Sequence, residues 1–163
     1  MEIRKVDNSV NELLDGPTLD ASALAGKIQR LHIFFSLLIP DMSHEEKQLL
    51  DEALIKTYAR KGITHKNESL TDPQHPEQYK KMPILEDVYN VLLESEDTKR
   101  LAHILNRLVH GSASSFNQQT NVDLTNKYTV LDISELTGSS DLLTVGMFVA
   151  LDYVWDKAKE NRT

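Results

Sequence analysis

The residue pair Gly26-Lys27 is the nearest approach in this sequence to a phosphate-binding loop, whose pattern is G-x-x-x-x-G-K-[ST]. That pattern needs an earlier glycine and a hydroxyl residue directly after the lysine, but this chain has Ala21 and Ile28 there. The segment also has the apolar spacing of a helix, in which no glycine-rich loop can surround a phosphate. The sequence therefore predicts no phosphate site at this position.

Other residue types that carry chemistry are present without a catalytic spacing. Asp51-Glu52, an acidic pair of the kind that holds Mg²⁺ in nucleotide motors, lies in an amphipathic helical pattern instead of following an apolar strand. The six histidines show no H-x-x-x-H spacing, and we expect structural or surface roles for all of them: His32, His44, His65, His75, His103 and His110. The absence of cysteine excludes disulfides, thiolate zinc sites and thiol catalysis. We expect no catalytic residue, metal ligand or cofactor site in this chain.

Asp132 is the acidic residue whose position most resembles a ligand site. It lies near the carboxyl end of the run Tyr128–Ile133, which has the β-branched and apolar composition of a buried strand. Ligands of α/β proteins bind at the carboxyl ends of such strands. Alternatively, Asp132, with Ser134 or Glu135, satisfies backbone groups in the following turn, and we prefer this second interpretation.

Four amphipathic helices are predicted in the first two thirds of the chain, because apolar residues recur there at intervals of three and four. Ser43 and Glu46 have the spacing of a capping box at the start of the second helix. The segment Ile63–Pro83 is polar and is predicted to be a loop. The predicted helices are Ala21–Ile39, the segment between Ser43 and Gly62, Ile84–Leu93 and Thr98–Val109.

The last third of the chain predicts a strand followed by a helix that is apolar nearly all the way round. A strand buried on both faces needs neighbouring strands for its backbone groups, yet Val122–Leu124 is the one further candidate for an edge strand. The sequence therefore predicts a piece of a larger α/β protein. Leu151 and Trp155 belong to the apolar surface that the missing sheet would cover, and we expect the chain to self-associate through this surface.

The predicted fold class is thus mainly α, with about four helices followed by a strand–helix piece of an α/β domain. We expect an extended lead-in at residues 1–20, an all-α subdomain at 21–111, and a loop, strand and helix at 112–163. The 25 acidic and 18 basic residues give a formal net charge of −7, which opposes binding to a phosphate backbone. No run is long enough to cross a bilayer, and the N-terminus has no apolar export segment.

Several blocks of this sequence resemble the traffic ATPases of conjugative-transfer and type IV secretion systems, in their VirB/TraC-like class. The match extends from about Ala21 to Arg162. Its blocks are Ile28–Asp41, Lys81–Leu85, Asn121–Leu124, Tyr128–Ser134 and Met147–Trp155.

The resemblance implies that residues 21–111 are the all-α insertion of a RecA-like motor and that 128–162 are its next strand and helix. It further implies assembly with other copies of the protein and with channel components, at the cytoplasmic face of the membrane. The parent protein would use ATP and Mg²⁺ to power pilus assembly or substrate transfer. Its phosphate-binding loop and acidic strand would lie before and after this segment, so we expect the isolated chain to be inactive.

Two readings from other classes compete with this one. The chain could be a free-standing helical adaptor that binds a protein partner and has no relationship to an ATPase. A helix-turn-helix DNA binder is disfavoured, because the net charge is negative and no basic recognition helix is present. We expect no direct contact with nucleic acid, and contact with a membrane only through partner proteins.

Overall fold

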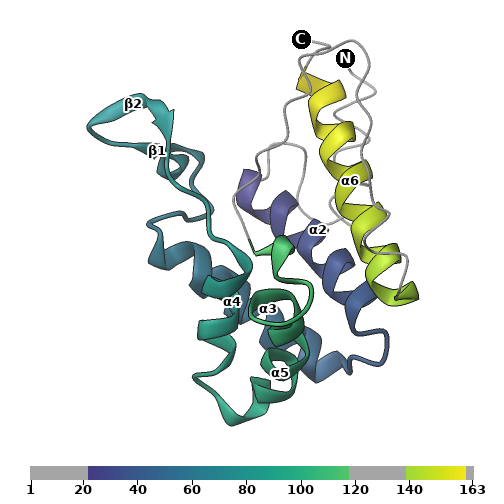
Figure 1. The fold of residues 1–163 in the computed structure, drawn as a ribbon. Coiled ribbons are helices and arrows are strands. Elements are labelled where there is room, and N and C mark those ends of the chain that lie inside the picture. The colour runs from purple at the N-terminus through teal and green to yellow at the C-terminus, as the bar shows by residue number, and fades with distance from the viewer. Residues whose placement is uncertain (1–21, 118–138, 161–163) are drawn as a thin grey trace, which may run out of the picture.

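The computed structural model describes residues 22–117 and 139–160, which contain five α-helices and one two-stranded antiparallel sheet (Figure 1). The prediction of a mainly α fold is confirmed. The helices are α2 (Ala23–Leu38), α3 (His44–Arg60), α4 (Leu85–Leu92), α5 (Lys99–Val109) and α6 (Ser140–Glu160). The strands are β1 (Thr71–Asp72) and β2 (His75–Tyr79), and three short 3-10 helices lie at Asn67–Leu70, Glu96–Thr98 and Ser114–Phe116.

The helix ends follow the local signals in the sequence. At the start of α3, Glu46 donates its backbone N–H to the Ser43 hydroxyl at 3.1 Å, and Ser43 donates its own to the Glu46 carboxylate at 2.9 Å. The predicted capping box is therefore confirmed. Beyond the other end of α3, Gly62 has a φ of +74°, a conformation that suits glycine because it has no Cβ.

The core lies among α2, α3, α4 and α5, whose apolar faces meet in one cluster. The predicted stripe of α2 is buried at Leu24, Ile28, Phe35 and Leu38. Two side chains of α6, Leu142 and Val145, join the described core. Fully buried side chains from the other helices include Leu50, Leu54, Leu92, Leu101, Leu105 and Leu108.

The segment Ile63–Pro83 carries a hairpin, so the prediction that it is all loop is wrong. Every residue of β2 is exposed, which leaves no apolar alternation that would have predicted a strand. The Asp72 carboxylate accepts the backbone N–H of Gln74 at 2.8 Å and shapes the turn. The Lys80 ammonium donates to the Gly62 carbonyl at 2.8 Å and ties the hairpin to the end of α3.

The predicted strands Tyr128–Ile133 and Val122–Leu124 lie outside the described residues, as does Asp132. Helix α6 runs alongside α2, and the hairpin stands on the other side of the molecule (Figure 1). The arrangement leaves much of α6 without a described neighbour to cover it.

Candidate functional site

Helix α6 carries the largest group of exposed apolar side chains in the part of the chain that the structure describes. Leu151 is 66% exposed, Trp155 is 60% exposed and Met147 is 47% exposed. Val149 and Val154 are also exposed. Several large apolar side chains exposed along one helix indicate a candidate site of interaction, because leaving them in water is unfavourable.

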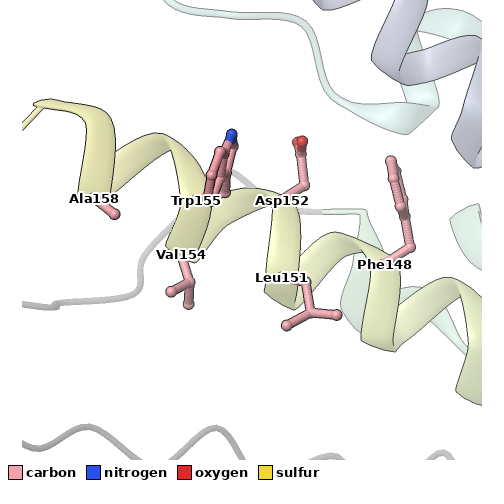
Figure 2. A pocket seen from close by; sticks show the side chains of 6 residues that line it. All are labelled: Phe148, Leu151, Asp152, Val154, Trp155 and Ala158. Atoms are coloured by element: carbon pink, nitrogen blue, oxygen red, sulfur yellow. The ribbon is translucent and has the colours of Figure 1, made fainter.

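Part of this surface lines an open hollow, here called the α6 hollow. Its described lining residues are Phe148, Leu151, Asp152, Val154, Trp155 and Ala158. Figure 2 shows Phe148, Asp152 and Trp155 on one side of the helix and Leu151 and Val154 on the other. The lining is almost wholly apolar, so the hollow suits an apolar partner.

Asp152, the carboxylate of the α6 hollow, is paired with a cation. The Arg30 guanidinium of α2 lies 3.7 Å from the Asp152 carboxylate, and it also donates a hydrogen bond to Asp156 one turn further along α6. Partial burial disfavours the charge of Arg30, but its bond to Asp156 and the field of both carboxylates outweigh this and raise its pKa. Asp152 is therefore held as an ion-pair partner.

The start of α6 is attached to α5 by a second arginine. The Arg107 guanidinium donates to the Ser139 hydroxyl and to the Asp141 carboxylate, each at 3.1 Å. A hydrogen bond from Ser139, followed by backbone contacts and the Arg107 charge, lowers the pKa of Asp141. The two arginines thus fix α6 at its first turn and near its C-terminal end.

Several of the other residues considered for chemistry have structural partners. The His32 ring lies 2.8 Å from Asp51, so the acidic residue joins α3 to α2. The His110 ring contacts Asn106 at 3.0 Å and Glu86 at 3.5 Å. Within residues 22–117 and 139–160, no group of three or more acidic or histidine side chains is arranged to hold a metal ion. His32, Asp51 and His110 are thus engaged in structural contacts.

Of the predicted interaction residues, the structure brings Leu151 and Trp155 together in the α6 hollow, while Asp132 lies outside the described residues. Sequence reasoning missed Phe148 and Asp152. The spacing of Phe148, Asp152 and Trp155 by four and three residues was the signal that places them on one side of α6. Arg30 had no such signal, since it is 126 residues from Asp156 in sequence.

Among the described helices, none has the length and apolar character needed to cross a bilayer. No protein-family model and no curated protein matches the chain. The chain is similar in structure to VirB4 of Thermoanaerobacter pseudethanolicus, with a TM-score of 0.77 and 26% sequence identity. The match covers 90% of this chain and 56% of the VirB4 chain. The resemblance to type IV secretion ATPases is confirmed, and this chain spans little more than half of the length of that relative.

Proposed function

We propose that this chain is a non-catalytic segment of an ATPase of type IV secretion or conjugation. The observation that carries the proposal is the similarity to VirB4 over 90% of the chain. The match covers 56% of the VirB4 chain, so a parent protein of similar length would contain further parts that this segment does not supply. The similarity favours an ATPase segment over a free-standing helical adaptor.

In this proposal the helical residues 21–111 are the all-α subdomain of the parent motor, and 112–163 belong to its RecA-like part. ATP and Mg²⁺ bind to residues outside this segment, since Gly26-Lys27 lies inside α2 and no described cluster could hold a metal ion. The role of the segment is then to bind neighbouring subunits or channel components at the cytoplasmic face of the membrane.

The α6 hollow supplies the contact surface in this proposal. The exposed side chains Leu151 and Trp155 offer apolar area, which gains free energy when a partner covers it. In the parent protein, the remainder of the motor covers the α6 hollow. In the isolated chain a second copy takes its place, so the chain self-associates through α6.

Two experiments test this function. The purified chain, supplied with ATP and Mg²⁺, is expected to release no phosphate from ATP above background. An ATP-hydrolysing activity that copurifies with the chain contradicts the proposal. The reading frame around this sequence is expected to encode a phosphate-binding loop before it and an apolar run ending in Asp-Glu after it. A frame that encodes neither favours the adaptor.

Self-association is tested by sedimentation velocity on the double variant Leu151→Ser/Trp155→Ser. It is expected to sediment as a monomer at concentrations where the unchanged chain forms larger species. The matched control is Leu93→Ser, because Leu93 is an exposed leucine on another helix end, at 41% exposure. Equal weakening by the control variant contradicts a specific role of α6.

A further inference from the structure

Six positions along α6 share one face of the helix. They follow one another at alternating intervals of four and three residues, the spacing that aligns side chains in a row along a helix. All six are exposed, with Met147 at 47%, Leu151 at 66% and Val154 at 40%. This row, here called the α6 seam, consists of Ser140, Thr144, Met147, Leu151, Val154 and Ala158.

The α6 seam faces away from the helical body. Val145, which lies between two seam positions in the sequence, is fully buried and joins the core. Arg30 of α2 approaches α6 at Asp152. Leu151 and Val154 lie on the side of the helix opposite Asp152 (Figure 2). A partner can therefore cover the seam while α6 stays packed on α2.

The seam is complementary to a second copy of itself that runs in the opposite direction. Its small side chains lie at the two ends and its largest ones in the middle. The Thr144 hydroxyl donates to the Ser140 carbonyl at 3.0 Å, so its polarity is satisfied within the helix. A register centred near Val149 joins side chains of similar size across the two copies. The pairs in this register are Met147 with Leu151, Thr144 with Val154, and Ser140 with Ala158.

Charges near the ends of the seam favour the antiparallel direction over the parallel one. Asp141 and Lys159 are about five turns apart, so both lie along the same edge of the seam. In an antiparallel pair this edge faces its equivalent, which brings Asp141 of each copy toward Lys159 of the other. A parallel pair brings like charges together at both ends, which is unfavourable. Arg107 contacts Asp141 within the chain, but the Asp141 side chain is still 49% exposed, so a lysine of a second copy can approach it.

We propose that two copies of this chain associate through their α6 seams, antiparallel and about a two-fold axis near Val149. The inference rests on the proposed function, in which α6 is the contact surface, and adds the face, the direction and the register of the contact. Met147 and Leu151 supply apolar area at the centre of the pair. Asp141 and Lys159 set the direction at its ends.

Disulfide cross-linking tests the direction of the pair, because the chain has no native cysteine. The variants Ser140→Cys and Ala158→Cys place one thiol at either end of the seam and remove no large side chain. In the antiparallel pair, each of these thiols lies beside the other position of the second copy. Two thiols at the same position lie about 27 Å apart, at a rise of about 1.5 Å per residue. A disulfide needs Cα atoms within about 7 Å, so it cannot join them.

The two single variants are oxidised mildly, alone and as a mixture, at a concentration where the chain self-associates. The mixture is expected to give a covalent dimer on non-reducing gels, whereas neither variant gives one alone. The matched control is Ser36→Cys, a serine exposed on α2, which is expected to give no covalent dimer when mixed with Ala158→Cys. A covalent dimer from either seam variant alone contradicts the antiparallel direction. Absence of a covalent dimer from the mixture contradicts contact through the seam.

The charges at the seam ends are tested with Lys159→Glu, and Lys47→Glu makes the same change at an exposed lysine of α3. Sedimentation velocity at low salt is expected to show weaker self-association for Lys159→Glu than for Lys47→Glu. This difference should shrink at high salt, because salt screens exposed charges. Equal self-association of the two variants at low salt contradicts the role of Lys159.

Failure of this inference is distinguishable from failure of the proposed function. A chain that self-associates but gives no cross-link between the Ser140 and Ala158 positions contradicts the seam pairing alone. ATP hydrolysis by the chain contradicts the proposed function, whatever the cross-linking result.

Discussion

Leu105 and Leu151 have the same side chain in opposite environments, so truncating each to alanine separates folding from binding. Leu105 on α5 is 0% exposed, whereas Leu151 on α6 is 66% exposed. Removing a fully buried leucine side chain costs about 2–5 kcal/mol, because the lost transfer energy and the cavity add. With about a third of its surface covered, and ~1.5–3 kcal/mol for full burial, Leu151 should cost about 0.5–1 kcal/mol.

The assay is urea unfolding followed by circular dichroism, at several protein concentrations, alongside sedimentation velocity. Low concentration matters, because self-association stabilises the folded chain by mass action. Leu105→Ala is expected to lower the free energy of unfolding severely and to leave the α6 surface intact. Leu151→Ala is expected to keep most of the stability and to weaken self-association. If both variants lose the same stability in the monomer, the assignment of Leu151 to an interaction surface is wrong.

Three further predictions concern the helix ends. Gly62→Ala should lower the free energy of unfolding by about 1–2 kcal/mol, because the left-handed backbone strains an L-residue and the new Cβ would lie 3.0 Å from Lys80 Nζ; no loss in urea unfolding contradicts it. Ser43→Ala should cost about 1 kcal/mol through the lost cap, and thermal melting checks this against Ser36→Ala, an exposed serine inside α2. The Ser43 backbone bond, and then Arg100, lower the pKa of Glu46 below its ordinary 4.5. The stability that the ionised Glu46 side chain contributes is therefore complete above pH 4.5 and is lost as the pH falls through the lowered pKa. The Glu46→Gln variant lacks this carboxylate, so its free energy of unfolding should fall less on acidification; an identical fall in both proteins contradicts this.

The helical part of the fold was predictable from the sequence, because its signals are local. The stripe from Leu24 to Leu38 follows the helical period, and Ser43 with Glu46 marks the start of α3 through atoms three residues apart. The hairpin at β1 and β2 was not predictable in the same way, since its strands bury no apolar face and depend on the turn at Asp72. The strand Tyr128–Ile133 remains a prediction.

The candidate site was predictable only in its apolar half. Leu151 and Trp155 belong to a helix that is apolar nearly all the way round, and this pattern predicts apolar surface that a missing sheet would cover. The Arg30 contacts with Asp152 and Asp156 join segments far apart in the chain, and many other arginine and aspartate pairs would have been equally plausible from sequence. Such tertiary ion pairs follow from the packing of α6 on α2, which local patterns do not encode.

The central claim is that this chain is a segment of a larger secretion ATPase. The most direct measurement is the mass of the native polypeptide, detected in the cells that produce it by an antibody against the helical part at 22–117. The account predicts a polypeptide much heavier than the 18.5 kDa of this sequence, since the chain matches just 56% of the VirB4 chain. A native polypeptide of 18.5 kDa would contradict it.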